Sequence, residues 1–483
     1  MRSLLERTKT LLPKEGFGRN VILVVTGTAL GQALVVLASP VLTRFFTPAQ
    51  FGVLAVYMAV LSVLLIFSSL RYELAIPLPQ SDGEAVNLLA ISVAVVPIVS
   101  LLSWLGIVVF EHRLVEALNA PRLAGYLWLL PIGVLIVGLH QALTYWTTRK
   151  SRFAALSYSR VLQSAGQVGT QVTAGAGGGG PGALIAGVFA GRLLASVSLL
   201  RHARIPVHDI QPSSWLRTAW QYRHFPIYTT WASLLTTAGT SATPIMFALF
   251  FPLHVVGIIS LNVRILGLPA AIIGQAVTQV FYPRAAQLRE DVQAARVFVP
   301  RVATGLLLVA LPVFMFVGVA GPTVFPYVLG ANWSEAGLYA RYLAPWLALN
   351  FIASPLSTFS LVKSRQRAAF FITTYEVALR FGGIWLGGRA HSPLLATGLY
   401  SAAGFVISGV YVLWILHLTG TTLRAWLRPL TSYLIVASCC LILLAVLGAA
   451  MSGVAYVLIA AIVTFGFGAW GFVSHREVLP IHG

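Results

Sequence analysis

The chain has 483 residues, of which 58% are apolar and only 9% are charged. Soluble proteins carry about a quarter charged residues, so this composition excludes a soluble globular protein and indicates a chain embedded in lipid. The formal net charge of +19 does not indicate nucleic-acid binding, because the basic residues lie in short clusters between apolar segments, as in polytopic membrane proteins.

Apolar segments of about 20 residues recur along the chain, and this is the length a helix needs to cross a hydrocarbon core of about 30 Å. The first segment is too long for the apolar part of a cleaved signal peptide, so we expect it to remain as a helix. The segment 283–300 has helical periodicity, and we expect it to lie along the membrane surface. Fourteen membrane-spanning helices are predicted, at residues 20–42, 52–76, 85–110, 125–147, 156–176, 182–201, 226–250, 254–281, 302–329, 337–362, 368–388, 393–418, 429–450 and 453–473.

The basic residues between these segments predict the orientation of the chain. With the N-terminus in the cytoplasm, 23 Lys and Arg residues fall on the cytoplasmic side, and only Arg44, Arg113, Arg122 and Arg389 fall on the other side. Because positive charge is retained in the cytoplasm, both termini are expected inside, which agrees with an even number of spans. No outer loop is long enough to hold a catalytic domain.

An internal repeat is visible when the chain is compared with itself. The stretch "ASPVLTRFFTPAQFGVLA" resembles "ATPIMFALFFPLHVVGII" at residues 242–259, with a Pro, a Phe pair, a second Pro and a Gly in the same order. The repeat would relate two six-helix halves, a design that is common in transporters. It predicts an N-terminal lobe at 1–223, a C-terminal lobe at 224–418 and two appended helices at 419–483.

Four segments carry a resemblance to a known family. They are "SPVLTRFFTPAQFGVLAVYMAVLSV", "LRYELAIPLP" with "EAVNLL", "VGIISLNVRILGLPAAIIGQAVTQVFYPR" and "ANWSEAGLYARYLAPWLALNFIASPL". In these segments the chain resembles the polysaccharide transporter family, which includes the O-antigen flippases of the Wzx type. That family is itself similar in fold to lipid II flippases and multidrug extruders.

The resemblance implies an all-α membrane protein of two six-helix lobes around a central cavity, with two further helices that form a groove for a lipid tail. Its cargo would be an undecaprenyl-diphosphate-linked oligosaccharide, moved from the cytoplasmic to the periplasmic leaflet of a bacterial inner membrane for O-antigen, capsule or exopolysaccharide synthesis. The implied partners are this polyprenyl-linked cargo, membrane lipid and other polysaccharide assembly proteins.

Arginines within the apolar segments are the strongest candidates for cargo binding. A diphosphate needs a cationic path through hydrocarbon, and an Arg that faces lipid costs about 2.5–3.5 kcal/mol, so these side chains are expected to face a cavity. Arg264 is the leading candidate for the diphosphate, because no acidic residue lies within a helical turn of it and Pro269 follows. The alternative is pairing with backbone carbonyls or with a distant Glu.

Other charged residues leave two interpretations open. Glu73 is two residues from Arg71, so the pair would point to different sides of a helix, and either Glu73 forms a gate with a base on the other lobe or Arg71 extends to the inner surface. Glu376 and Arg380 have the i, i+4 spacing of an ion pair, which would neutralise them, or Arg380 contacts cargo. Arg341 and Arg44 would line the outer part of the cavity, or Arg341 would extend to the surface.

Glutamines provide a second kind of candidate site. Gln163, Gln167 and Gln171 recur every four residues and form a stripe on one face of the fifth span, and Gln275 lies on the eighth. Amides can bind sugar hydroxyls, but they also bridge neighbouring helices, and both roles stay open.

The sequence contains no set of residues suited to catalysis, phosphate-loop chemistry or metal binding, so we predict a transporter without cofactor or metal rather than an enzyme. Two alternatives remain. One is a cation-coupled multidrug or small-solute exporter of the same fold. The other is a membrane polysaccharide polymerase or ligase, which would typically need a large periplasmic loop.

Overall fold

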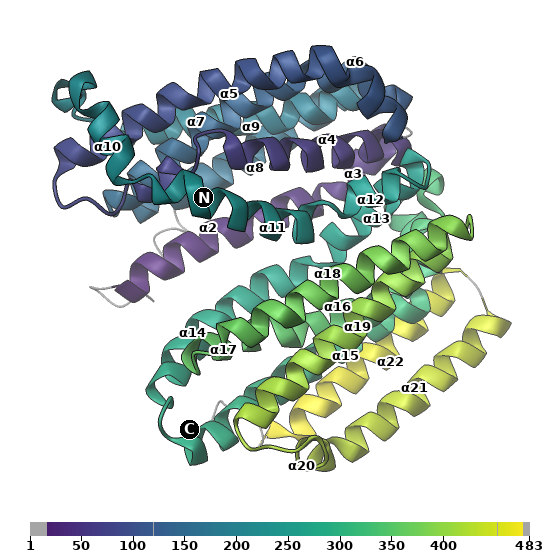
Figure 1. Ribbon diagram of the computed structural model, residues 1–483. Helices are drawn as coiled ribbons and strands as arrows, with labels where there is room; N and C mark the ends of the chain where they lie inside the picture. Colours follow the sequence, from purple (N-terminus) through teal and green to yellow (C-terminus); the bar gives the residue numbers. More distant parts are fainter. Residues whose placement is uncertain (1–16, 119, 452, 477–483) are drawn as a thin grey trace, which may run out of the picture. The chain divides into compact units, whose positions relative to one another are not determined.

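The computed structural model describes residues 17–118, 120–451 and 453–476, and within these ranges every regular element is helical. By their internal contacts these residues divide into two compact units (Figure 1). The first unit comprises the residues up to Phe46 together with Val53–Ile245, and the second comprises Thr47–Gly52 together with the residues from Met246 onward. The expected all-helical class is confirmed, whereas the three-part division of the chain stays a prediction.

The first unit consists of long helices joined by short turns. α8 and α9 form a closely packed hairpin, and α2 packs along α8. Only the first residues of α4 belong to the second unit. The helices are α2 (Phe17–Leu37), α3 (Ser39–Phe45), α4 (Pro48–Phe67), α5 (Asp82–Ala117), α6 (Pro121–Leu127), α7 (Leu129–Arg149), α8 (Phe153–Ala176), α9 (Pro181–Ala203), α10 (Trp215–Gln221) and α11 (Thr230–Ser241).

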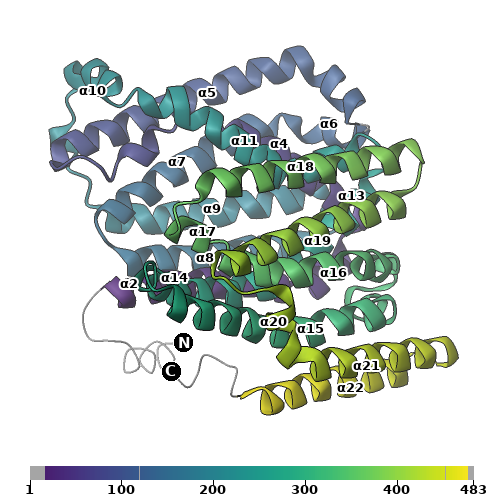
Figure 2. The same cartoon turned by 60° about the horizontal axis from the view of Figure 1, so that its bottom comes forward.

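The second unit is built around α15 and α16. α15 packs against α16 and α22, α16 also contacts α13 and α19, and α21 lies beside α22 (Figure 2). The helices are α12 (Thr243–Ala248), which starts at the end of the first unit, α13 (Leu253–Leu266), α14 (Gln275–Gln287), α15 (Val292–Leu329), α16 (Ala336–Leu356), α17 (Phe359–Val362), α18 (Gln366–Arg389), α19 (Pro393–Leu418), α20 (Leu423–Leu427), α21 (Thr431–Ala450) and α22 (Val454–Ser474).

The predicted spans all fall in helical regions, but their number is not confirmed. In the described chain ten helices are long and apolar enough to cross a membrane, or eleven if the bent pair Leu253–Leu266 and Ala270–Thr278 is counted as one span. The other predicted spans, at 156–176, 226–250 and 368–388, do not meet this test. The first is rich in glutamine, the second is broken into short helices, and the third carries an acidic and a basic residue in its middle.

The predicted surface helix at 283–300 is wrong. α14 continues through Gln287 and α15 begins at Val292, so the segment is divided between the ends of two long helices. Asp291 caps α15, because its side chain accepts a hydrogen bond from the backbone N–H of Ala294 at 2.9 Å. The helical periodicity was read correctly, but the polar residues in its middle mark a helix boundary.

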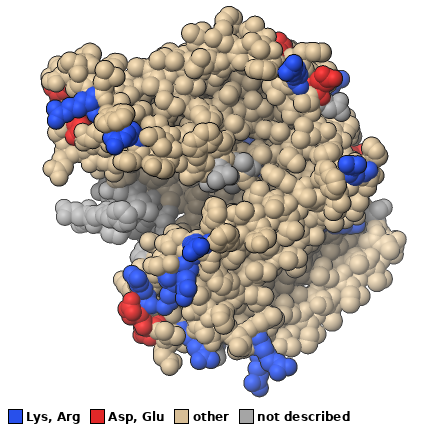
Figure 3. All heavy atoms as spheres, in the orientation of Figure 1, with Lys and Arg blue, Asp and Glu red and all other residues tan. Residues whose placement is uncertain are grey.

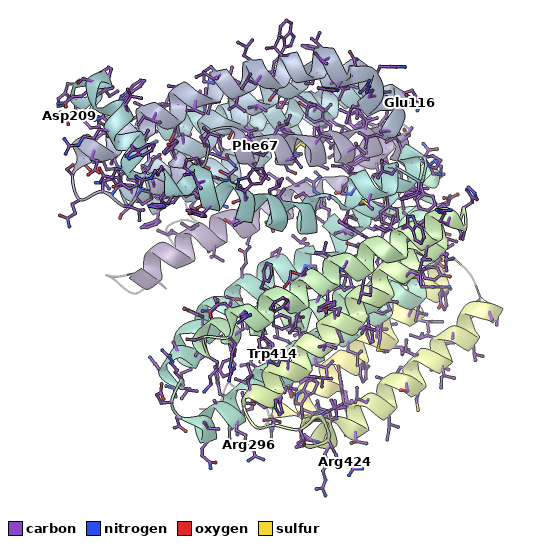
Figure 4. The ribbon with its side chains drawn as sticks, viewed as in Figure 1. Phe67, Glu116, Asp209, Arg296, Trp414 and Arg424 are labelled. Carbon is purple, nitrogen blue, oxygen red and sulfur yellow. The ribbon has the colours of Figure 1, made fainter. Side chains whose placement is uncertain are left out.

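The segment between α9 and α10 is tied to the first turns of α5. The Asn87 side chain accepts a hydrogen bond from the backbone N–H of Gln211 at 2.8 Å and donates one to the carbonyl of Asp209 at 3.3 Å. Glu84 accepts hydrogen bonds from Gln221 and Tyr222. Asp209 therefore lies beside the first turns of α5, and Glu116 lies in the last turn of this helix, so the two labels in Figure 4 show where α5 begins and ends.

Both copies of the internal repeat contain the same local structure. A short helix, α3 or α12, is followed by a break and then by a long helix whose start is marked by proline, with Pro48 as the first residue of α4 and Pro252 as the N-cap of α13. Proline suits these positions because the first turn of a helix does not use its N–H groups.

Each copy of the repeat contains a glycine, Gly52 on α4 and Gly257 on α13. Within the second unit, each of these glycines packs against the helix of the other copy. A Cβ atom on Gly52 would overlap the carbonyl oxygen of Leu253, and one on Gly257 would overlap the carbonyl oxygen of Pro48. The first turns of α4 and α13 therefore approach more closely than any larger residue permits. Phe51 packs edge to face on Trp333 beside this contact, with ring centroids 5.2 Å apart.

Charged residues are scarce on the sides of both units. The surfaces visible in Figure 3 are almost wholly uncharged, and the blue and red side chains lie towards their margins. Many large apolar side chains of the long helices are exposed, among them Leu102 and Val109 on α5 and Ile462 on α22. Exposed apolar surface of this extent is stable only against lipid, so the chain is a multi-pass membrane protein.

We predict that Gly257→Ala destabilises the protein, because its methyl group would overlap the Pro48 carbonyl and force the first turns of α4 and α13 apart. Overpacking of this kind costs about 1–3 kcal/mol. The measurement is the midpoint of thermal unfolding in detergent. Gly382→Ala is the matched control, because no atom lies within 4 Å of a Cβ built there. Equal unfolding midpoints for the two variants would contradict the prediction.

Candidate functional site

A polar cavity of about 350 Å³ lies inside the first unit, between α2, α7, α8 and α9. A water molecule occupies about 30 Å³ in the liquid, so this space can hold a small ionic group with some of its hydration. We refer to it as the polar cavity. Its lining residues are Thr28, Gly31, Gln32, His140, Gln141, Thr144, Tyr145, Leu156, Ser159, Arg160, Gln163, Ser164 and Arg192.

The polar cavity is lined by two arginines and by no carboxylate among the described residues. Neither Arg160 nor Arg192 takes part in any ion pair of the described chain. Nε of Arg192 and Oε1 of Gln141 are buried and have no hydrogen-bond partner within it. An unsatisfied buried polar group costs about 1–3 kcal/mol and a charged one costs more, so these side chains are candidates for binding a further group.

His140 connects two walls of the polar cavity. Its Nδ1 lies 3.1 Å from Oγ of Ser196 on α9, and the Ser196 hydroxyl donates a hydrogen bond to the carbonyl oxygen of Arg192 at 2.8 Å. The imidazole is buried, with 6% of its surface exposed. These bonds fix the position of the ring beside the backbone of Arg192.

An apolar groove of about 530 Å³ lies in the second unit between α15, α16, α19, α20 and α21. Leu423, Trp426 and Leu427 of α20 and Leu434 and Leu441 of α21 form the wall contributed by the predicted appended segment. We refer to this space as the apolar groove. Arg341 is the one charged residue among its described lining residues. A groove of this composition suits an apolar ligand such as a hydrocarbon chain.

Arg341 satisfies a defect in the backbone of α15. Pro322 has no N–H, so the carbonyl of Gly318, four residues earlier, loses its helical partner. Arg341 donates from Nε to the Gly318 carbonyl oxygen at 2.8 Å and from Nη2 to that of Val319 at 3.3 Å. The Arg341 side chain is exposed and lies at the wall of the apolar groove, so both expected roles, extension to the surface and lining of the central cavity, stay predictions.

The amino-acid sequence of residues 41–337 matches the profile of a family of polysaccharide biosynthesis proteins. The chain belongs to this family. The match covers more than half of the chain and confirms the resemblance to polysaccharide transporters. Among curated protein sequences none matches the chain.

Solved structures show that this family member has the fold of the multidrug/oligosaccharidyl-lipid/polysaccharide exporter superfamily. The lipid II flippase MurJ in its inward closed conformation matches with a TM-score of 0.72 at 12% identity, over 95% of this chain and 99% of that one. A multidrug resistance MATE family transporter in an inward-facing conformation matches with a TM-score of 0.63 at 15% identity, over 80% of this chain and 94% of that one. At these identities the likeness concerns the fold.

Arg264 is the leading candidate that the sequence analysis identified. It lies in the last turn of α13 and is half-buried. It belongs to none of the ion pairs of the described chain. A bend of 44° separates α13 from the segment Ala270–Thr278, and Pro269 lies at this break. Gln275 follows at the start of α14 and is also half-buried. The role of Arg264 in cargo binding stays a prediction.

Arg380 has several protein partners. It forms the expected ion pair with Glu376, one helical turn away on α18. Its guanidinium also lies over the rings of Trp346 and Tyr400, 4.0 Å and 4.8 Å from their centroids, and it donates a hydrogen bond to the Tyr400 hydroxyl at 3.0 Å. These contacts neutralise the charge of Arg380 inside the second unit.

Arg71 and Glu73 pair with each other, which corrects the expectation that they point to different sides of a helix. Their side chains lie 3.5 Å apart, and the Ser69 hydroxyl also donates to Glu73. α4 ends at Phe67, and Arg71 has a φ of 63°, so helical spacing does not apply to these residues. Glu73 is almost fully buried, at 1% exposure.

The glutamine stripe on α8 separates into two environments. Gln163 lines the polar cavity, whereas Gln171 is buried and donates from Nε2 to the carbonyl of Leu184 on α9 at 2.9 Å. Gln167 packs against Gly191 of α9, and its backbone nitrogen lies 3.0 Å from a Cβ built on that glycine. Arg44 is exposed in the last turn of α3.

Sequence reasoning did not identify Arg160, Arg192 and His140 as one site. The sequence predicts Arg160 both among the cytoplasmic bases and at the base of the glutamine stripe, because it precedes Gln163 by three residues on the same helix and so shares a face with it. That spacing was the available signal. Nothing in the sequence relates this face to His140 or Arg192, which lie on other helices.

A double-mutant cycle tests the structural role of Arg341. We predict that Arg341→Met lowers the free energy of unfolding by about 1–3 kcal/mol, because the Gly318 carbonyl loses its donor. In a Pro322→Ala background the restored N–H of residue 322 can bond that carbonyl, so the same change costs less there. Unfolding in detergent by a denaturing surfactant provides the measurement, and equal costs in both backgrounds would contradict this role.

Proposed function

We propose that the protein is a flippase that moves undecaprenyl-diphosphate-linked oligosaccharide from the cytoplasmic to the periplasmic leaflet. The observation that carries the proposal is the apolar groove, which is walled by α20 and α21 in addition to the helices of the second unit. A polyprenyl tail is a long hydrocarbon that does not enter a hydrated path. A transporter of lipid-linked cargo therefore needs a separate apolar binding site for the tail.

The comparisons support this proposal over drug export. A solved lipid II flippase matches over 95% of the chain, whereas the multidrug transporter with the TM-score of 0.63 matches over 80%. The polar cavity also favours an anionic cargo, because its described lining contains two arginines and no acidic residue. Multidrug export remains the second candidate, on the strength of the shared fold.

The protein would act by alternating access in the bacterial inner membrane, with both termini in the cytoplasm and with other polysaccharide assembly proteins as partners. In this scheme the tail occupies the apolar groove while arginines hold the diphosphate. Arg264 suits the latter role, because it is a half-buried cation without a carboxylate partner in the described chain, next to a break between α13 and α14.

We predict that Arg264→Ala abolishes surface polysaccharide while the protein remains inserted in the membrane, because the diphosphate would lose its cationic contact. The measurements are surface polysaccharide by immunoblotting and protein abundance in the membrane fraction. Arg424→Ala, a change of an exposed base on α20, is the control. Normal polysaccharide in the Arg264 variant would remove this residue from the proposed site.

We also predict that Gly409→Phe blocks transport, because the ring would enter the apolar groove. The site tolerates a side chain, since the nearest atom to a Cβ built there is Cδ2 of Leu349 at 3.8 Å. Lipid-linked oligosaccharide should accumulate in the cytoplasmic leaflet, which is measured by its accessibility in everted and intact vesicles. Ile462→Phe, on the exposed surface of α22, should have no effect. Unchanged transport in the Gly409 variant would argue against the groove as the tail site.

A further inference from the structure

The hydrogen bonds of His140 determine which ring nitrogen carries the proton. Ser196 has a single hydroxyl hydrogen, and it is donated to the carbonyl oxygen of Arg192 at 2.8 Å. If the Ser196 hydrogen stays on that carbonyl, the Ser196 oxygen only accepts, and Nδ1 of His140, 3.1 Å away, is the donor. A neutral His140 therefore carries its hydrogen on Nδ1, and Nε2 is left as a lone-pair acceptor.

In this tautomer, neutral His140 cannot donate a hydrogen bond to an anion in the polar cavity. Arg160 and Arg192 offer N–H donors to an anion, but the neutral His140 ring offers it only a lone pair. His140 becomes a donor to the same anion when Nε2 binds a proton, as both ring nitrogens then carry hydrogen. An anion beside the ring attracts that proton, and by thermodynamic reciprocity the proton strengthens binding of the anion.

Among the described residues that line the polar cavity, Arg160 and Arg192 are the charged groups beside His140. The charged groups that act on it are Arg192 on α9 and Arg160 on α8. α2 contributes Thr28 and Gln32, and α7 itself contributes Gln141 and the titratable Tyr145. The acidic residues of α5 lie in its end turns, and Glu73 is paired with Arg71.

We propose that the polar cavity is a site where a phosphate-type anion and one proton bind together, with Arg160 and Arg192 as its cationic ligands and His140 as the proton acceptor. The site itself stands on the geometry of the first unit. Its assignment to the diphosphate of a lipid-linked cargo rests on the proposed function. In that case binding of the cargo would be accompanied by uptake of one proton from solution by His140.

Sulfate is the probe for the linkage, because its charge does not change between about pH 5 and pH 8, whereas phosphoryl groups titrate near pH 6. Sulfate binding to the purified full-length protein is measured by titration calorimetry at several pH values, in pairs of buffers with different ionisation enthalpies. We expect affinity to rise as the pH falls, by at most about tenfold per pH unit, with net uptake of up to one proton per sulfate bound.

Single substitutions test what each side chain of the polar cavity contributes to sulfate binding. Arg192→Gln and Arg160→Gln should each weaken sulfate binding by about tenfold or more, because a charged hydrogen bond is lost. His140→Gln should retain weaker binding that no longer depends on pH. Ser196→Ala frees Nδ1 from its acceptor, so a neutral ring can present Nε2–H and the pH dependence should decrease. Arg201→Gln and His202→Gln, at the exposed end of α9, are the matched controls.

Several results would overturn the proposal. Absence of sulfate binding by the folded wild-type protein would reject the anion site, and so would binding that is equal in the arginine variants and the controls. Binding without pH dependence or proton uptake would show that Ser196 donates to His140 instead, which rejects the linked proton. Thermal unfolding of each variant identifies those that fold, and Arg160→Gln, at an exposed residue, serves if Arg192→Gln does not.

A second comparison separates this inference from the proposed function. Geranyl diphosphate and inorganic diphosphate are titrated under the same conditions, and tighter binding of the ester would support cargo as the ligand, whereas equal binding would reject that assignment. If the site binds anions but the protein does not support polysaccharide export, the proposed function fails and the anion site stands. If export is normal in Arg192→Gln cells, the assignment of the site to the cargo fails and the function stands.

Discussion

The hydrocarbon core contains no water to hydrogen-bond polar groups, and this constraint explains most of the polar contacts in the protein. Pro322 removes a helical hydrogen bond from α15, and Arg341 supplies donors to the carbonyls beside the defect. Arg380 would be costly alone in its unit, and Glu376 and two aromatic rings surround it. Gln171 completes the same pattern by bonding a backbone carbonyl across the α8–α9 hairpin.

Against this background the exceptions are informative. Arg160 and Arg192 lie near each other at the polar cavity with no carboxylate in its described lining. A structural role would be better served by an ion pair, as with Arg380 and Glu376. Two neighbouring cations without a carboxylate gain free energy when an anion binds, which is why we propose them as the ligands of an anion site.

Two of the cavities, one in each unit, present opposite chemistry. The first unit contains a cavity lined by amide, hydroxyl, imidazole and guanidinium groups, and the second unit contains a groove lined almost wholly by hydrocarbon. A lipid-linked saccharide has the same two parts, a charged and hydroxylated head and a long apolar tail. Separate binding sites for these parts would let the head cross while the tail remains in an apolar environment. The charged head then avoids transfer into hydrocarbon, and the tail avoids transfer into water.

The sequence by itself determined the membrane class, the helical positions, the family and the equivalence of the regions around Gly52 and Gly257. These follow from local composition and spacing, because a span needs a continuous run of apolar residues and a turn needs its own Pro and Gly. It also identified the Glu376–Arg380 pair, whose partners lie one helical turn apart. Only the tertiary structure decided that Arg71 pairs with Glu73 outside a helix, that Arg341 bonds α15, and that His140, Arg160 and Arg192 meet in one cavity. The latter three residues come from three helices, and the contact of one helix face with another depends on packing and rotation that no local pattern encodes.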